Sequence, residues 1–145
     1  MAWINERRGL NNQQENYEFA KSLGEKYNYE VIFQDTNKFL CLQDWLSLLS
    51  QFKFIINIDR GFGGGQVPIE SAILEVIHFG GLTNGAICLW PQTAIIDKGR
   101  LDFEFYFLHN DNLLQEKTIK DTLERVKKYH SFENTYKKLQ DILND

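Results

Sequence analysis

Apolar positions along this chain follow two different periods, one typical of helices and one typical of strands. Spacings of three and four residues, which place side chains on one face of a helix, occur over 12–27 and 42–52 and again after Pro68. Proline suits the first turn of a helix, because the amide hydrogen that it lacks would have no partner there. The third helix is expected to bury a stripe within 69–77 and to end at the glycine pair 80–81.

Runs of β-branched and aromatic residues between the helical stretches predict strands. The predicted strands are residues 2–5, 29–33, 53–58, 86–90 and 101–108. The run 53–58 is almost continuously apolar, as expected for a central parallel strand that helices cover on both faces. In the run 101–108, phenylalanines alternate with Asp102 and Glu104, which predicts a strand whose acidic side chains face solvent.

Two further helices are expected near the end of the chain. Asn110 and Asp111 can cap the first of them, and Ser131 can cap the second. Strands and helices alternate along the chain, and this order predicts an α/β fold with a parallel sheet. No stretch rich in glycine, serine or proline separates one part of the chain from another. Residues 1–145 are therefore expected to form a single Rossmann-like domain with helices on both faces of the sheet.

Composition places the chain among ordinary globular proteins and argues against several classes of partner. Of its 145 residues, 43% are hydrophobic and 25% are charged, a balance that supports a buried core. The net charge of -4 argues against a nucleic-acid partner, which usually selects a basic surface. The sequence has no polybasic run, no apolar run near ~20 residues and no signal-peptide layout. We therefore expect a cytoplasmic protein, with membrane contact only peripheral and only through a partner.

The cysteines and histidines are not spaced for a metal site. Cys41 and Cys88 each lie in an apolar stretch and are expected to be buried thiols. His78, His109 and His130 share no ligand spacing with the cysteines or with each other, so no metal is expected. His78 is predicted to lie near the end of the third helix, in a structural role.

The segment 59–70 carries the strongest indication of chemistry in the chain. It combines a strand end, a flexible turn and the start of a helix. Three residues of the turn lack a Cβ, so that the backbone can approach a ligand: Gly63, Gly64 and Gly65. The first turn of the helix presents unpaired N–H groups at Gln66 and Val67, in the positive end of the helix dipole. A phosphate is the natural ligand for this arrangement, and Arg60 could add a charged contact.

The glycine turn and Glu70 also have interpretations that involve no ligand. A flexible surface turn would have the same composition as the glycine turn. Glu70 lies in the first turn of the helix, where a carboxylate can simply offset the helix dipole, an effect of roughly 0.3–1 kcal/mol. Alternatively, its two oxygens can accept hydrogen bonds from neighbouring hydroxyls of a sugar ring. The spacing matches neither a P-loop nor a dinucleotide-binding fingerprint.

The sequence around this turn resembles a known signature. Phe62-Gly63, followed by Pro68-Ile-Glu-Ser-Ala72, is similar to the nucleotide-sugar-binding signature in the C-terminal half of GT-B glycosyltransferases. In that family a Gly-Phe-Gly turn leads into Pro-x-x-Glu-Ala or a close variant, which opens a helix that ends in glycine. The corresponding ending here is Phe79-Gly-Gly81. The resemblance covers about residues 42–81 in sequence and roughly 1–143 in the order of elements.

The resemblance implies roles for particular residues. Glu70 would match the second glutamate of the family's paired-glutamate motif and would hold the ribose, while the glycine turn would face the diphosphate. Arg7 and Arg8 stand in the loop after the first strand, where the family places basic residues near the phosphates; the alternative is that they are solvated surface residues. Phe62 stands where the first glutamate is expected, so Asp59 would be its displaced counterpart.

The resemblance further implies a glycosyltransferase module that binds a nucleoside-diphosphate sugar as donor. GT-B enzymes consist of two Rossmann-like halves and this chain has room for one, so a second domain or subunit would hold the acceptor. Arg60, Glu70 and Asp59 would be the catalytic residues, and the departing diphosphate would be stabilised without a metal or a cofactor. The alternative is a non-catalytic Rossmann-like module that binds a phosphate, a nucleotide or a partner protein.

Overall fold

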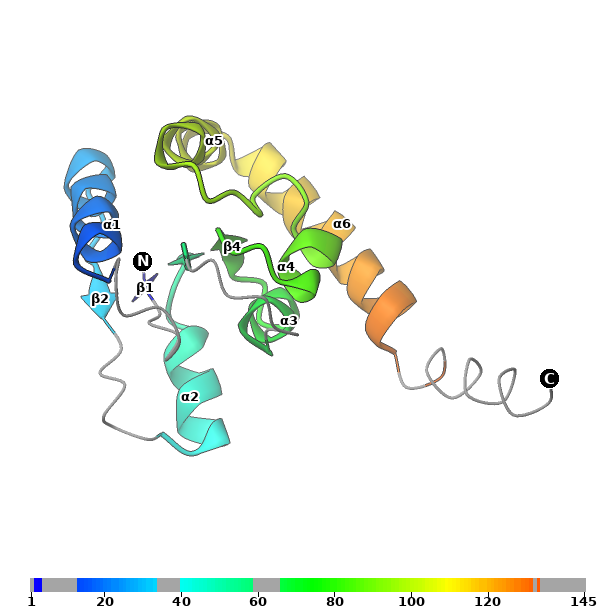
Figure 1. Cartoon of the computed structure of the whole chain (residues 1–145). Coiled ribbons are helices and arrows are strands. Elements are labelled where there is room, and N and C mark those ends of the chain that lie inside the picture. The colour runs from blue at the N-terminus through cyan, green and yellow to red at the C-terminus, as the bar shows by residue number, and fades with distance from the viewer. Residues whose placement is uncertain (1, 4–12, 34–39, 59–65, 132, 134–145) are drawn as a thin grey trace.

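The chain folds as a mixed α/β structure that is mostly helical and contains a small parallel sheet (Figure 1). The computed structural model describes residues 2–3, 13–33, 40–58, 66–131 and 133. The strands are β1 (Ala2–Trp3), β2 (Ile32–Phe33), β3 (Phe54–Ile56) and β4 (Ile77–Phe79). They pair in the order β2-β1-β3-β4, and every pair is parallel. The predicted α/β class with a parallel sheet is confirmed.

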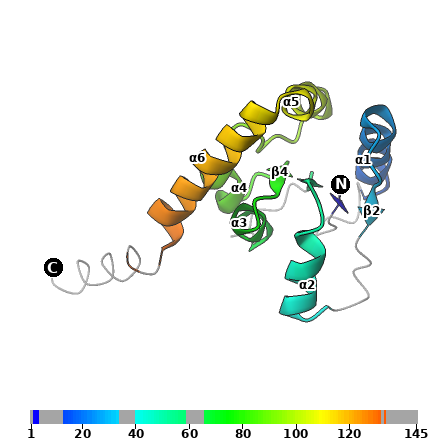
Figure 2. The same cartoon turned by 180° about the vertical axis from the view of Figure 1, so that it is seen from behind.

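Six helices occur in the described part of the chain. They are α1 (Gln13–Tyr27), α2 (Leu42–Leu49), α3 (Gln66–Ile73), α4 (Asn84–Leu89), α5 (Lys98–Asn110) and α6 (Asn112–His130). α1 lies toward β2, whereas α3 and α4 lie toward β4, as both views show (Figures 1 and 2). α6 starts beside α5 and runs past α4 and α3. α5 also contacts α1, which closes the core between the two halves of the chain.

The core consists of two apolar clusters that take alternate residues of β3. Phe54 and Ile56 belong to the larger cluster, which also contains Phe105 of α5. Ile55 belongs to the smaller cluster, together with Leu49 of α2. The alternation follows from the two-residue period of a strand. All three residues of β3 are fully buried, which confirms the prediction of a central strand in this part of the sequence.

The predicted third helix is shorter than its apolar stripe suggests. α3 ends at Ile73, and Glu75 adopts a left-handed φ of 59°. The residues that follow enter β4, where Ile77 pairs with Phe54 of β3. The prediction of a helix as far as residue 77 is therefore wrong. An apolar run that lies beside a buried strand can form backbone hydrogen bonds to it, and this outweighs a helical spacing of side chains.

The glycine pair ends a strand and not a helix. Gly80 and Gly81 have φ values of 91° and 76°, which residues with a Cβ rarely adopt. A Cβ on Gly80 would lie 2.1 Å from the carbonyl oxygen of Asn57. Glycine is required at this position so that the chain leaving β4 can pass against the end of β3.

Two predicted strands are helices in the structure. Residues 86–90 fall mostly within α4, which Thr83 caps by accepting a hydrogen bond from the amide of Ala86. Residues 101–108 lie within α5, which Asp97 caps in the same way. Both predictions are wrong, because a short apolar run can be a buried strand or the buried side of a helix, and periodicity alone does not separate the two.

The alternating phenylalanines of α5 therefore do not share a face. Phe105 is fully buried together with Leu101 and Leu108, whereas Phe103 and Phe107 are exposed. The buried residues are spaced by four and three, as expected for one side of a helix. A strand would have placed all three phenylalanines on one face, whereas the helix places one in the core and two on the surface.

Both cysteines are exposed and free, so the prediction of buried thiols is wrong. Cys41 immediately precedes α2, and its sulfur accepts a hydrogen bond from the amide of Asp44. Cys88 lies on the outer side of α4, while Ala86 and Leu89 face the core. Apolar neighbours in the sequence do not bury these cysteines, because only one side of each adjacent helix faces the core and neither cysteine lies on that side.

The cap predicted for α6 is present. Asp111 accepts a hydrogen bond from the amide of Leu114 at 3.0 Å, which confirms it as the N-cap. Ser131 follows the last residue of α6, and the helix predicted beyond it lies almost entirely outside the described residues.

Candidate functional site

The carboxyl ends of β1 and β3 lie side by side in the sheet. Trp3 of β1 pairs with Ile56 of β3, and the strand order reverses between these two strands, since β2 lies beyond β1 and β4 lies beyond β3. In open parallel sheets, such a reversal marks the crevice where ligands bind. The connections that leave this edge of the sheet are therefore where a ligand site is expected.

Most of the residues predicted to bind a donor belong to these two connections and lie outside the described residues. They are Arg7, Arg8, Asp59, Arg60, Gly63, Gly64 and Gly65. The structure does place Gln66, Val67 and Glu70, all of which belong to α3. Of the predicted site, the structure therefore describes only the part that belongs to α3.

The first turn of α3 is anchored to the core. α3 begins at Gln66, close to the start predicted at Pro68. Gln66 is exposed, whereas Val67 is half-buried and packs against the smaller apolar cluster. The carbonyl oxygen of the buried Pro68 accepts hydrogen bonds from the indole of Trp90 at 2.9 Å and from the hydroxyl of Ser71 at 3.0 Å. Helix geometry directs the amides of this anchored turn toward the segment that precedes it.

Glu70 lies beyond the first turn of α3, so its predicted place in that turn is wrong. It is bonded to the neighbouring helix α2. The indole N–H of Trp45 donates a hydrogen bond of 2.7 Å to Oε2 of Glu70, and both residues are half-buried. A carboxylate has several acceptor positions, so this bond leaves capacity for a ligand. Sequence patterns assign Trp45 only to an apolar stripe, and the site prediction misses it. The available signal is the indole N–H itself, a donor that usually finds a partner when it is buried.

The neighbouring end of β4 is held by backbone hydrogen bonds. The amide of Asn57 donates to the carbonyl of Phe79, and the amide of Gly80 donates to the carbonyl of Thr93, both at 2.7 Å. The hydroxyl of Thr93 donates to the carbonyl of His78 at 2.5 Å. The segment between α4 and α5 is thereby tied to the end of β4 at the carboxyl edge of the sheet.

His78 lies in the middle of β4, so its predicted place near the end of a helix is wrong. Its side chain is fully buried, and neither ring nitrogen has a hydrogen-bond partner among the residues that the structure describes. It pairs in register with Ile55 and points to the opposite face from Ile77 and Phe79. Burial lowers the pKa of His78 from 6.5 to about 3, so the imidazole is neutral at pH 7.

A second group of polar side chains joins α1 to α5. Asp102 accepts hydrogen bonds from Nζ of Lys26 at 2.9 and 2.7 Å and from the hydroxyl of Tyr27 at 2.9 Å. The hydroxyl of Tyr29 lies 3.0 Å from Nδ1 of His109. The prediction that Asp102 belongs to a solvated strand face is therefore wrong. The sequence does not indicate this group, because its members come together only when 101–108 is helical.

Burial and pairing shift the pKa values in this group away from catalytic use. Burial opposes the charge on Asp102, but the hydrogen bonds from Lys26 and Tyr27 outweigh it, and the pKa of Asp102 is lowered. The bond to Asp102 raises the pKa of Lys26. Burial raises the pKa of Tyr27 and of Tyr29. None of these four groups is brought toward neutral pH, as a general acid or base would require, and the arrangement serves to tie the two helices together.

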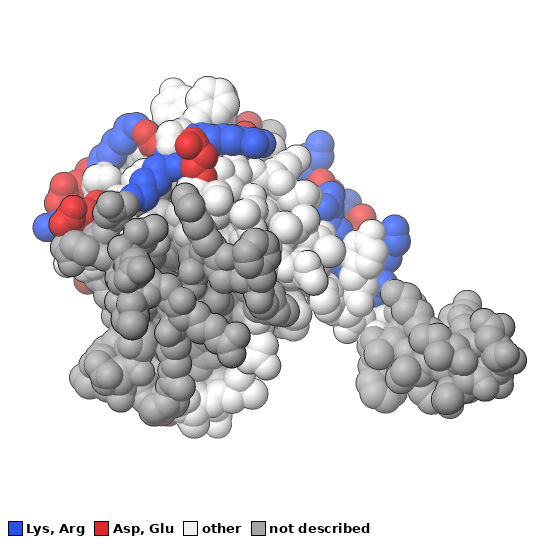
Figure 3. All heavy atoms as spheres, viewed as in Figure 1, with Lys and Arg blue, Asp and Glu red and all other residues white. Residues whose placement is uncertain are grey.

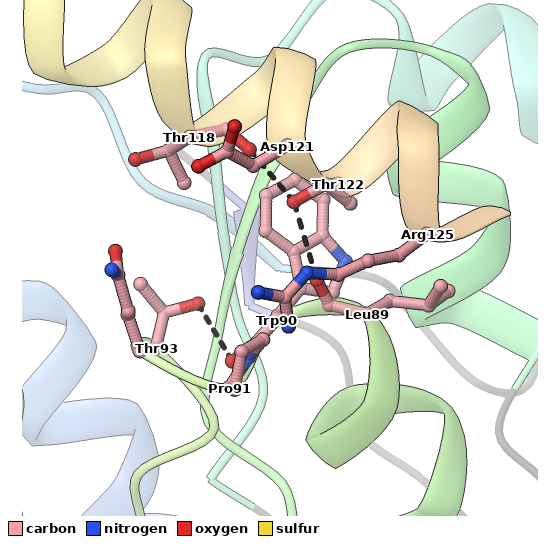
Figure 4. A pocket seen from close by; sticks show the side chains of 9 residues that line it. Leu89, Trp90, Pro91, Thr93, Thr118, Asp121, Thr122 and Arg125 are labelled. Atoms are coloured by element: carbon pink, nitrogen blue, oxygen red, sulfur yellow. Dashed lines mark hydrogen bonds between the residues drawn. The ribbon is translucent and has the colours of Figure 1, made fainter. Parts of the chain in front are cut away.

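A small pocket lies between α6 and the segment that follows α4 (Figure 4). It has a volume of about 20 Å³ and is lined by Leu89, Trp90, Pro91, Gln92, Thr93, Thr118, Asp121, Thr122 and Arg125. The hydroxyl of Thr122 donates to the carbonyl of Leu89 at 3.2 Å and joins the two walls. A cavity of this volume suits a single water molecule, so it is too small for a nucleotide.

A wider hollow lies next to this pocket. Its volume is about 470 Å³, and it is lined by Asp121, Glu124, Arg125, Lys128 and Tyr129. All of these residues belong to α6, so the hollow follows the surface of one helix and is not a cleft between elements. It is lined by two acidic and two basic side chains.

The described part of the chain contains no group of three or more His, Cys, Asp or Glu residues placed to hold a metal ion. Among its helices, none is both long and apolar enough to span a bilayer. Compared with protein-family models, with curated proteins and with solved structures, the chain matches none of them.

Proposed function

We propose that the chain is the nucleotide-sugar-binding module of a GT-B-type glycosyltransferase. The observation that carries this proposal is the place of the glycine-rich segment, which joins the carboxyl end of β3 to α3 next to the reversal of strand order. Ligands of open parallel sheets bind in such a crevice. The resemblance of residues 42–81 to the family's signature favours a nucleoside-diphosphate sugar as the ligand.

In this proposal the module is a Rossmann-like domain with helices on both faces of its sheet. Two observations support it. The strands are parallel and out of sequence order, and alternate residues of β3 pack with Phe105 of α5 and with Leu49 of α2. The described strands have two or three residues each, so the domain would be a reduced form of that fold.

The diphosphate would lie at the first turn of α3. The amides of Gln66 and Val67 stand at the positive end of the helix dipole, which favours an anion. The glycines at 63–65 would allow the backbone to approach the phosphates. Arg60 would offset the negative charge that develops on the departing diphosphate. The two arginines in the connection after β1 would add positive charge from the adjacent strand.

Glu70 would hold the ribose. The bond from Trp45 to Oε2 would orient the carboxylate before the donor arrives, so that less side-chain entropy is lost on binding. Its remaining acceptor positions suit two neighbouring hydroxyls. Asp59 would be the second acid of the pair.

The reaction would transfer the sugar from the diphosphate oxygen to a hydroxyl of an acceptor. A second domain or subunit would hold the acceptor and the base that takes its proton, because GT-B enzymes place both in their other half. The part of this chain would be to bind and orient the donor and to stabilise the leaving diphosphate.

Isothermal titration calorimetry with uridine and guanosine diphosphate tests this proposal. We expect one of them to bind, and we expect Glu70→Ala and Arg60→Ala each to weaken binding about tenfold, or about 1.4 kcal/mol. Glu124→Ala is the matched control, since Glu124 is an exposed glutamate on α6 and should leave the affinity unchanged. Failure of the wild-type chain to bind any nucleoside diphosphate would refute the proposal.

The alternative is a non-catalytic Rossmann-like module that binds a phosphate, a nucleotide or a partner protein. The hydrogen bond from Trp45 to Glu70 favours this alternative, because the carboxylate then has a structural partner and needs no ligand. If the module binds a phosphate or a partner protein, Glu70→Ala should lower stability without a change in nucleotide affinity. If it binds a nucleotide without catalysis, no added partner chain should restore sugar transfer. A partner chain that restores sugar transfer when it is added would argue against it.

A further inference from the structure

α5 carries apolar side chains on two opposite sides. Its inner side contributes three buried residues to the core: Leu101, Phe105 and Leu108. Its outer side carries three aromatic residues that are 60%, 52% and 44% exposed: Phe103, Tyr106 and Phe107. Large apolar side chains that gather on the exposed side of a helix mark an interaction surface. The outer side of α5 is therefore expected to have a partner.

These three exposed residues, named here the outer aromatic face, form one continuous patch. The ring centroids of Phe103 and Phe107 are 4.8 Å apart, and those of Tyr106 and Phe107 are 5.5 Å apart. Figure 3 shows uncharged side chains projecting above α5, with both basic and acidic residues beside them. Clustered large apolar side chains on a surface mark interaction sites, whereas single ones do not.

Two charged residues flank the outer aromatic face at opposite ends of α5. Arg100 lies about one turn before Phe103, and Asp111 lies about one turn after Phe107. Both charged residues are exposed. They are about three helical turns apart, which places them on the same side of the helix. The face thus has a positive end and a negative end, with aromatic rings between them.

We propose that the outer aromatic face binds the same face of a second copy of this chain, with the two α5 helices antiparallel. A two-fold axis between the helices places Arg100 of each copy beside Asp111 of the other, and Phe103 against Phe107 of the other. A parallel arrangement places like charges together at both ends, which is unfavourable. Charge complementarity therefore selects a second copy and also its orientation.

A membrane surface fits this face less well than a second copy does. Anionic lipids attract clusters of Lys and Arg, whereas α5 contains Asp102 and Glu104 as well as Lys98 and Arg100. The proposed dimer is independent of the donor site proposed above, because it uses the outer side of α5 and not the carboxyl edge of the sheet.

Sedimentation equilibrium of the full chain over a range of concentrations tests the proposal. We expect a reversible equilibrium between monomer and dimer. Phe103→Glu should weaken the dimer at least about tenfold, because it places a charge among packed rings, and Tyr106→Ser should weaken it in the same direction. Ile87→Glu is the matched control, because Ile87 is 47% exposed on α4 and lies outside the face. It should leave the equilibrium unchanged.

Arg100→Glu and Asp111→Asn test the antiparallel orientation. Asparagine caps a helix about as well as aspartate does, so Asp111→Asn removes the charge while keeping the cap of α6. Arg100→Glu should weaken the dimer about tenfold in the wild-type background and clearly less in the Asp111→Asn background, because the new repulsion is then absent. The circular dichroism spectrum should be unchanged for every variant.

The proposal is overturned if the wild-type chain stays monomeric at every concentration, or if Ile87→Glu acts as strongly as Phe103→Glu. An equal effect of Arg100→Glu in both backgrounds overturns the antiparallel orientation. Binding of the monomer through Phe103 to phospholipid vesicles or to a different protein, without self-association, also overturns the proposal.

Discussion

Two polar regions of this molecule are stabilised in opposite ways. At β4, His78 is fully buried without a hydrogen-bond partner in the part of the chain that is described, and Gly80 packs tightly against the end of β3. Between α1 and α5, Asp102 is partly exposed and is bonded to both Lys26 and Tyr27. The stability of the first region depends on close packing and on an uncharged His78. The stability of the second depends on hydrogen bonds between polar side chains.

From this difference we expect burial, and not the number of polar contacts, to decide how sensitive each region is to substitution. A charge or an additional atom in a dry, close-packed site has no way to relax, so its cost is large. Partly exposed pairs lose little when they are broken, because water replaces the lost partner. Substitutions at β4 should therefore have much larger effects than substitutions between α1 and α5.

The largest effect is expected for Gly80→Ala. Alanine would have to adopt a φ of 91°, and its Cβ would lie 2.1 Å from the carbonyl oxygen of Asn57, so that β3 and β4 would have to separate. We expect the free energy of unfolding, measured by urea denaturation, to fall by more than about 3 kcal/mol. Gly99→Ala is the control, since the nearest atom to its Cβ is 3.5 Å away; its effect should be below about 1 kcal/mol. Similar effects of the two variants would contradict the close approach described at Gly80.

The next largest effect concerns His78 and its response to pH. The pKa of His78 is about 3 in the folded protein and 6.5 without burial, so between these values the unfolded chain binds a proton that the folded chain does not. His78 should have no effect on the pH dependence above about 6.5, and below that value the free energy of unfolding should fall as the pH falls. Between pH 8 and pH 5 this loss should be about 2 kcal/mol.

The His78→Leu variant isolates this contribution, because leucine is also apolar and does not titrate. Urea denaturation at pH 8 and pH 5 should show that the wild-type chain loses about 2 kcal/mol more than His78→Leu does. Carboxylates such as Asp102 titrate in both proteins and cancel in the comparison. Parallel pH profiles for the two chains would mean that His78 is not held neutral by burial.

The smallest effect is expected for Asp102→Asn. Its bonds to Lys26 and Tyr27 are partly exposed, so the free energy of unfolding should fall by about 0.5–1 kcal/mol. The pKa of Asp102 is lowered, so its contribution is present above the ordinary pKa of aspartate and is lost as the pH falls through the lowered value. Added salt should reduce the difference between the variant and the wild-type chain, as measured by urea denaturation. A loss larger than that of Gly80→Ala would reverse the comparison between the two regions.

The close-packed region at β4 is also the one next to the proposed donor site. β4 lies beside β3, and the glycine-rich segment leaves β3 on its way to α3. Such a support suits the proposed binding site, in which the side chains of Trp45 and Glu70 are joined by a hydrogen bond between two helices. Preorganised groups on rigid elements bind with a smaller entropy loss than mobile ones.

Sequence patterns predicted the region around β3 well and the region after it poorly. The run that forms β3 is fully buried, and the helices on both sides of it carry clear apolar stripes, so that local and tertiary preferences agree. Residues 77–79 and 101–108 carry equally apolar runs that suit a strand or a helix, and their predicted structures were wrong. For the proposed site, the sequence predicts Glu70 but not its partner Trp45, because a bond between α2 and α3 depends on how the two helices pack.

By itself, the sequence determined the alternation of elements as far as β3, the start of α3 and the cap at Asp111. Only the tertiary structure decided that 77–79 joins the sheet and that 101–108 becomes a helix. The physical reason is that an apolar pattern reports which side chains avoid water, and both structures achieve this. The choice depends on whether the edge of a strand such as β3 is available for backbone hydrogen bonds, and chain segments far from the pattern determine that.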